Sequence, residues 1–184
     1  MSQLHSLSID ECGDLMFEWL QSHCNSKKSK EVAQAVGYKY SIFSPQRKIR
    51  VMEELTFLYT SVAIYGLNMA LSDETTAKEV IDAFLEKLHR KLFDVVVKDD
   101  VDFSGRYSER LSGYFHLFRS GGDGIGAAGD FMVGLFGTPN ARINNLPGLL
   151  HLAPKIESAL LSINHMLQLI EITGLASNPP HTER

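Results

Sequence analysis

The feature that most constrains this chain is a stretch of 18 residues without a charged side chain, Leu55 to Ser72. A helix formed by this stretch is apolar on most of its faces, so it must be surrounded either by lipid or by other helices of the same protein. Its length is at the short end for a membrane span, and Thr60, Gly66 and Asn68 dilute its hydrophobicity. We therefore expect a buried central helix and no membrane association.

Ser44 and Pro45 mark the start of this helix, because serine is a common N-cap residue and proline suits the first helical turn. The helix is predicted over 45–71, a length of about 40 Å at 1.5 Å per residue. Other segments repeat apolar residues at three- and four-residue steps, the period of one helix face. These further helices are predicted at 9–24, 30–36, 74–95, 103–119, 127–136 and 155–173. No segment is predicted to form an extended strand.

This pattern predicts an all-α fold, a single-domain helical bundle of five to six main helices around the long central helix. The domain is expected to cover residues 1–175. With 44% apolar and 22% charged residues the composition is ordinary for such a domain, and 184 residues can bury a sizeable core. Residues 176–184 are expected to form a disordered tail.

Both cysteines, Cys12 and Cys24, fall in the first predicted helix, about 18 Å apart along its axis. A disulfide needs Cα atoms closer than about 7 Å, so we expect two free thiols, which are typical of a reducing compartment. The first residues carry neither the basic nor the apolar region of a secretory signal. A cytoplasmic location is therefore predicted.

Seven basic residues and one acid, Glu31, lie between Asn25 and Arg50, although the whole chain has a net charge of −4. Such an asymmetry can mark a surface that faces a polyanion. The basic residues are Lys27, Lys28, Lys30, Lys39, Arg47, Lys48 and Arg50. Within this segment Ala33 and Gly37 have the Ala-x-x-x-Gly spacing of a helix-turn-helix, in which the alanine allows close helix packing and the glycine makes the turn.

This segment resembles the N-terminal DNA-binding motif of TetR-type repressors, which are all-α chains of about this size. The resemblance covers less than a fifth of the chain and implies a recognition helix over about 40–48. Pro45 departs from the family pattern, because a proline breaks the interior of a helix. A DNA-binding transcriptional regulator that uses residues 25–50 is therefore the first alternative function. A solvated basic face is the competing structural interpretation.

Gly124, Gly126 and Gly129 match the letters of the GxGxxG dinucleotide motif. That motif needs a strand before it and an acid about twenty residues further on. Here an aromatic helix is predicted before it, and Asn144 and Asn145 stand about twenty residues on. Close helix packing or a flexible cover over the core is the preferred interpretation of this segment, and we predict no cofactor.

Glu86 and His89 form one Glu-x-x-His step, the spacing that carboxylate-bridged metal bundles use. Such bundles need two of these steps and two further glutamates on neighbouring helices. The chain offers one step, with His116 as a third candidate ligand. A metal-dependent helical-bundle enzyme that uses these three residues is the second alternative function.

The predicted helix 103–119 carries basic and aromatic side chains beside the glycine-rich segment 121–137. The candidates for binding a small anion or a partner are Arg106, Tyr107, Arg110, His116 and Arg119. The arginines could equally be solvated or pair with Glu109. The sequence contains no GxSxG motif, no known catalytic cysteine signature and no Walker A lysine. We therefore expect a non-enzymatic protein that acts through a protein partner or through self-association as a homodimer, with a regulatory role.

Overall fold

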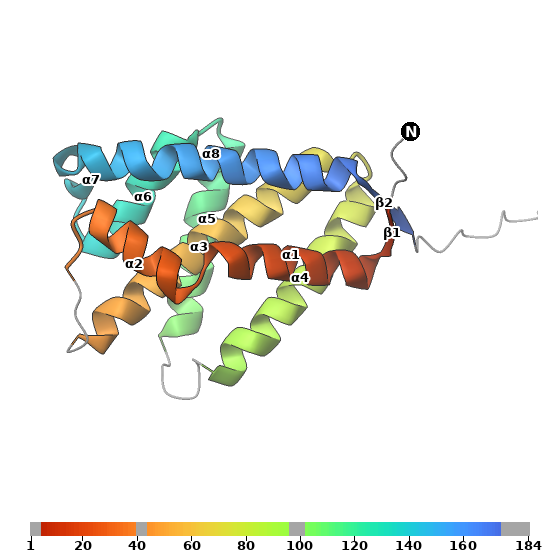
Figure 1. Cartoon of the computed structure of the whole chain (residues 1–184), viewed down its shortest axis with the longest axis horizontal. Coiled ribbons are helices and arrows are strands. Elements are labelled where there is room, and N and C mark those ends of the chain that lie inside the picture. The colour runs from red at the N-terminus through yellow and green to blue at the C-terminus, as the bar shows by residue number, and fades with distance from the viewer. Residues whose placement is uncertain (1–4, 40–43, 96–101, 174–184) are drawn as a thin grey trace, which may run out of the picture.

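The structure is a computed structural model, and it describes residues 5–39, 44–95 and 102–173 (Figure 1). It is predominantly helical, which confirms the all-α prediction. The helices are α1 (Ile9–His23), α2 (Ser26–Ala35), α3 (Pro45–Ala70), α4 (Glu74–Val95), α5 (Phe103–Arg119), α6 (Gly124–Phe136), α7 (Ala141–Asn144) and α8 (Leu146–Gln168). None of the described helices combines the length and the apolar character that a membrane crossing requires. The predicted tail at 176–184 lies outside the described residues.

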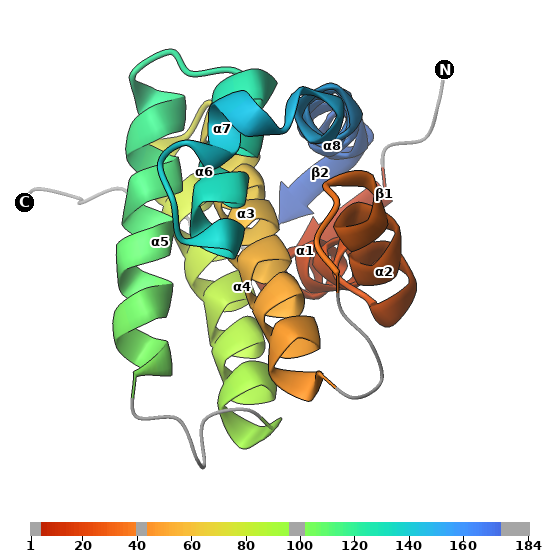
Figure 2. The ribbon, with the colours of Figure 1, turned by 90° about the vertical axis from the view of Figure 1, so that its left-hand side faces the viewer.

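The helices run in two main directions. Helices α3, α4 and α5 lie side by side in Figure 2. In the same view the axis of α8 points nearly toward the viewer, so α8 runs across the direction of these three helices. In Figure 1, α1 and α8 run along the long axis of the molecule, with α3 passing beneath both. Helix α3 contacts α1, α2, α4, α5, α6 and α8. It therefore supplies the inner surface on which most of the other helices pack.

The charge-free stretch is buried by the protein's own helices. Residues 54–63 are buried without interruption, and Gly66 and Leu67 follow one turn later. Because α3 is packed on several sides at once, the stretch needs no lipid to cover it. Burial was expected as far as Leu71, but this is wrong for the last turn, where Asn68 and Met69 are exposed.

Local capping residues explain the helix starts that were predicted correctly. Ser8 and Glu11 form a capping box at the start of α1, with the Glu11 backbone N–H donating to Ser8 Oγ over 3.2 Å. At the start of α4, Asp73 Oδ2 accepts hydrogen bonds from the backbone N–H and the hydroxyl of Thr76, both at 2.6 Å. Helix α5 matches its predicted bounds, and α3 matches within one residue.

Helices α2 and α6 begin slightly earlier than predicted because their caps lie further upstream. Asn25 Oδ1 accepts the N–H groups of Lys27 and Lys28 at 3.1 and 3.0 Å, so the polar segment after α1 forms the first turn of α2 instead of a break. Asp123 Oδ1 likewise accepts the N–H of Gly126 at 2.9 Å and starts α6 at Gly124.

Helix α8 differs most from its prediction. It begins at Leu146, where Asn145 Oδ1 accepts the Gly148 N–H at 3.0 Å, so Pro154 lies inside the helix and not before it. A proline in a helix interior costs about 3 kcal/mol. Burial of Leu152, Ala153 and other apolar side chains of the first half offsets that cost.

The prediction that no strand forms is wrong. Residues His5–Ser8 form β1 and Ile170–Thr173 form β2, and the two strands pair in parallel with Leu7 opposite Ile172. The last helix therefore ends at Gln168 instead of Thr173. Alternating β-branched residues in the Ile-Glu-Ile-Thr sequence favour the extended conformation once a partner strand is available.

Helices α1 and α4 approach each other closely at Gly13. A Cβ atom added there would lie 2.9 Å from Ala83 Cβ and 3.1 Å from the backbone nitrogen of Phe84. Because the backbone of α4 stands in the way, only glycine permits this helix separation.

We expect Gly13→Ala to destabilise the protein by about 1–3 kcal/mol, because the added methyl group overpacks the contact between α1 and α4. Gly113→Ala is the matched control, since Gly113 also lies inside a helix and a Cβ there would meet nothing within 4 Å. This control should gain about 0.5–1 kcal/mol from the better helix propensity of alanine. Denaturant unfolding measures both changes, and equal effects of the two substitutions would contradict the close approach.

Candidate functional site

Arg110 of α5 lies in a buried polar cluster with residues of α3 and α6. Its Nε and Nη2 atoms donate to Glu54 Oε2 at 3.1 and 2.9 Å. Nη2 also lies 2.9 Å from the hydroxyl of Tyr114 and 2.8 Å from the backbone oxygen of Asp130. The guanidinium group of Arg110 therefore links α5 to α3 and α6.

The electrostatics of the cluster follow from its burial. Glu54 is 6% exposed, and burial raises the pKa of its carboxyl while attraction to Arg110 opposes that rise. Burial also holds the pKa of Tyr114 well above its ordinary value, so the Tyr114 hydroxyl keeps its proton and donates to Glu54 Oε2 at 3.4 Å. Because Glu54 Oε2 accepts hydrogen bonds from both Arg110 and Tyr114, we interpret this pair as a structural link between the helices.

The five candidate residues predicted on α5 do not converge on one site. Arg106 pairs with Glu53 of α3 at 3.2 Å, and Tyr107 is buried with its hydroxyl 3.3 Å from His89 Nε2. His116 is exposed, and Arg119 lies over the ring of Phe115. Arg106 and Arg119 are thirteen positions apart, which corresponds to about 20 Å along the axis and to nearly opposite sides of the helix.

The suggested pairing of these arginines with Glu109 is wrong for Arg106 and Arg110. Both turn inward and pair with Glu53 and Glu54, two successive acids of α3. The sequence contained a signal for this arrangement, since Glu54 immediately precedes the charge-free stretch and Arg110 lies one turn before Tyr114 in an aromatic stripe.

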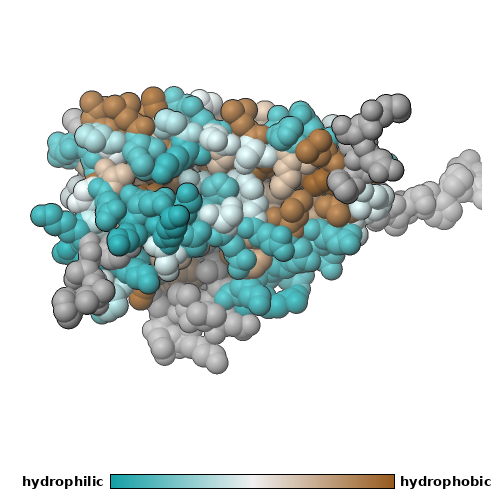
Figure 3. All heavy atoms as spheres, viewed as in Figure 1, coloured by the Kyte–Doolittle hydropathy of each residue, from teal (hydrophilic) through white to brown (hydrophobic). Residues whose placement is uncertain are grey.

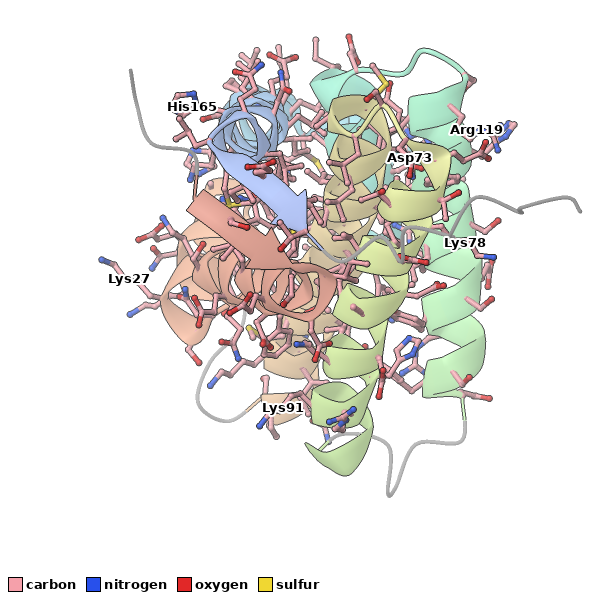
Figure 4. All side chains as sticks on the ribbon, turned by 90° about the vertical axis from the view of Figure 1, so that its right-hand side faces the viewer. Lys27, Asp73, Lys78, Lys91, Arg119 and His165 are labelled. Carbon is pink, nitrogen blue, oxygen red and sulfur yellow. The ribbon has the colours of Figure 1, made fainter. Side chains whose placement is uncertain are left out.

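The basic segment 25–50 is divided among several elements. Lys28 pairs with Glu31 at 3.5 Å, Arg47 donates to the backbone oxygen of Lys39 at 3.0 Å, and Arg50 Nη2 donates to that of Gly134 at 2.7 Å. Lys27, on α2, points away from the molecule in Figure 4, where Arg119 lies on the opposite side. Lys30, Lys39 and Lys48 are exposed.

The recognition helix implied over 40–48 is wrong for its second half. Residues 40–43 lie outside the described residues, and 45–48 form the first turn of α3. Pro45 suits that position because the first helical turn needs no backbone N–H donor.

The glycine motif at 124–129 lies inside α6, with α5 and a turn before it, so it lacks the strand that a dinucleotide site requires. A Cβ atom at Gly124 would lie 2.6 Å from the backbone oxygen of Ala153 in α8, and one at Gly129 would lie 3.2 Å from the side chain of Arg142. Close helix packing therefore explains these glycines.

The candidate metal ligands also lie apart. Glu86 pairs with Arg90 on the exposed side of α4, while His89 packs on the ring of Tyr107 with 5.4 Å between ring centroids. His116 belongs to α5 and is exposed. Within residues 5–39, 44–95 and 102–173, no three His, Cys, Asp or Glu side chains are placed to share a metal ion.

A row of large apolar side chains is exposed along the outer side of α8. Leu146, Leu150 and Leu161 are 59%, 65% and 69% exposed, and Ile125 is exposed at the start of the adjoining helix α6. We call these four residues the α8 patch. Figure 3 shows hydrophobic atoms over the start of α8 and again further along its upper edge. Large apolar side chains exposed together on one side of a molecule commonly mark an interaction site.

Comparison with known protein families, with curated proteins and with solved structures finds no match to this chain. The α8 patch is therefore a candidate site on physical grounds alone. The sequence pattern does not reveal the patch, because a helix that begins after Pro154 places Leu146 and Leu150 in a loop.

We expect Arg110→Met to destabilise the protein by about 3–5 kcal/mol, because it leaves the Glu54 carboxylate buried without its charged partner. The double variant with Glu54→Leu should recover much of this loss. Arg90→Met is the control, since the exposed Arg90–Glu86 pair on α4 contributes less than about 1 kcal/mol. Thermal and denaturant unfolding measure these changes, and a loss no larger than that of the control would contradict a structural role for Arg110.

Proposed function

We propose that this protein is a non-enzymatic, self-associating protein, in which the α8 patch of one copy meets the same patch of a second copy. The exposure of three leucines on one side of α8 is the observation that supports this proposal. Single leucines on a protein surface are common. Several exposed leucines on one side of a helix keep apolar surface in contact with water, and a partner surface can bury it.

The spacing of the leucines favours a second copy as the partner. Leu150 and Leu161 are eleven residues apart, which is about 16 Å and close to three full turns, so both lie on the same side of α8. In an antiparallel pair related by a two-fold axis, Leu150 of one copy would face Leu161 of the other, and the reverse contact would form at the same time. Such self-complementarity is what a two-fold homodimer requires.

The charged neighbour of the patch does not oppose this contact. Glu157 lies on the same side of α8, but its side chain leans against Gly124, the first residue of α6. A carboxylate is favourable at a helix N-terminus because of the exposed N–H groups there. The leucines on either side of Glu157 therefore remain the most prominent apolar groups of this face.

Several further features belong to the same proposal. The described elements form a single domain around α3, and the location is cytoplasmic, which the free thiols of Cys12 and Cys24 support because reduced cysteines are typical of that compartment. A regulatory role through changes in the association state fits a small helical protein of this kind.

We expect a concentration-dependent dimer of modest affinity, because a patch of four apolar side chains is smaller than a standard stable interface. Leu150→Asp and Leu161→Asp should each shift the protein to monomer in sedimentation velocity, since a charge would be buried in the contact. Ile49→Asp is the matched control, an exposed apolar residue in the first turns of α3, and it should leave association unchanged. A monomer at every concentration, or equal effects of all three substitutions, would contradict the proposal.

DNA binding is a separate alternative that the same protein preparation can test. If the basic segment contacted phosphates, each neutralised phosphate would contribute about 0.9 to the slope of log affinity against log salt concentration. We expect no duplex binding at low salt, because Arg47 and Arg50 are bonded to backbone oxygens of the protein. Binding that weakens when Lys27, Lys28 and Lys30 are replaced together by alanine would support the DNA-binding alternative instead.

A further inference from the structure

A groove of about 620 Å³ lies between α8 on one side and α1 and α2 on the other, with α3 as its floor. The helices that form it face the viewer in Figure 1. Its α8 wall carries Lys155, Ser158 and Ser162, which lie on a different side of the helix from the leucines of the α8 patch. The volume falls within the range of small-molecule sites. This groove is independent of the proposed self-association.

The inner part of the groove contains three aromatic rings. The ring centroid of His23 lies 4.3 Å from that of Trp19 and 4.9 Å from that of Tyr59. Trp19 Nε1 donates to Ser162 Oγ at 3.0 Å, which links α1 to α8 across the groove. Burial lowers the pKa of His23, so at neutral pH its ring joins this aromatic surface without a charge.

The rim of the groove is cationic. Lys28 on α2 and Lys155 on α8 line it from opposite walls, and none of the described residues that line it is acidic. Lys155 Nζ lies 2.7 Å from Nε2 of His151, whose pKa is lowered, chiefly by burial. A neutral His151 accepts this bond and holds the ammonium group of Lys155 in place. Among the described residues no carboxylate lies within ion-pair distance of Lys155, and the nearby Glu31, whose charge acts on the pKa of His151, pairs with Lys28. Lys28 Nζ forms this ion pair with Glu31 Oε2 at 3.5 Å.

We propose that this groove binds a small aromatic anion, with the ring of the ligand against the Trp19, His23 and Tyr59 surface and its anionic group between Lys28 and Lys155. An aromatic ring gains from burial and from contact with other rings, while an anionic group gains charge-assisted hydrogen bonds from the lysines and hydroxyl donors of the wall. A carboxylate and a phosphate both offer this chemistry. An apolar compound would contact only the aromatic surface of the groove, and a bare anion would contact only its lysines.

The protein carries a reporter for this site, because Trp19 is the only tryptophan in the chain. We expect titration with phenyl phosphate or with benzoate to change the Trp19 fluorescence in a saturable way, and the tighter of the two identifies the anionic group. Inorganic phosphate alone should bind at least about tenfold more weakly than phenyl phosphate, because it lacks the ring. Benzyl alcohol, which lacks the charge, should also bind at least about tenfold more weakly.

Lys155→Met should weaken binding of the preferred probe at least about tenfold, because it removes the charge and keeps the length of the side chain. Lys78→Met is the matched control, since Lys78 is exposed on α4 and points away from the groove side in Figure 4. Ser158→Phe should abolish binding by filling the groove, and circular dichroism checks that each variant keeps its helices.

Two results would overturn the proposal. One is the absence of any saturable fluorescence change with both aromatic anions in the millimolar range, and the other is an affinity of Lys155→Met equal to that of the wild type. Leu150→Asp, which tests the proposed self-association, should leave probe binding unchanged. The two proposals can therefore fail separately.

Discussion

The buried pair of Glu54 and Arg110 is the interaction on which the arrangement of the helices most depends. A carboxylate that is 6% exposed can keep its charge only if a partner cation reaches it. Arg110 reaches it from α5 and also bonds the Asp130 backbone oxygen of α6, so α3, α5 and α6 are held at one point. The small Gly134 leaves room for both side chains, since a Cβ atom there would collide with Arg110 and Glu54. The contacts of this one pair therefore involve three helices.

Around this pair, α3 is covered on most sides and α8 presents two outward surfaces of different chemistry. The α8 patch is apolar, whereas the groove wall with Lys155 and Ser158 is polar and cationic. This division follows from helical geometry, because leucines eleven residues apart share one side while Lys155 and Ser158 lie on another. One helix can thus support both proposals, contact with a second copy and binding of a small anion, without competition between the two surfaces.

Sequence patterns predicted the helical elements better than their ends. The three- and four-residue apolar repeats identified α4 and α5 well, because packing on α3 requires that period. Caps such as Asn25 and Asp123 are less informative in sequence, since asparagine and aspartate are equally common in loops. Pro154 was misleading because the cost of a proline inside α8 is offset by burial that only the folded state reveals. The strand at Ile170–Thr173 depends on β1, a partner more than 160 residues away in sequence.

The sequence by itself determined the helical class of the fold and the burial of most of the charge-free part of α3. These properties follow from the spacing of apolar and polar residues along one element. Only the tertiary structure decided that Arg110 bonds residues of α3 and α6, and that Trp19, Tyr59 and Lys155 line one groove. The reason is physical: a binding site joins side chains from several helices, and their meeting depends on crossing angles and close contacts such as those at Gly13 and Gly124, which no local pattern specifies.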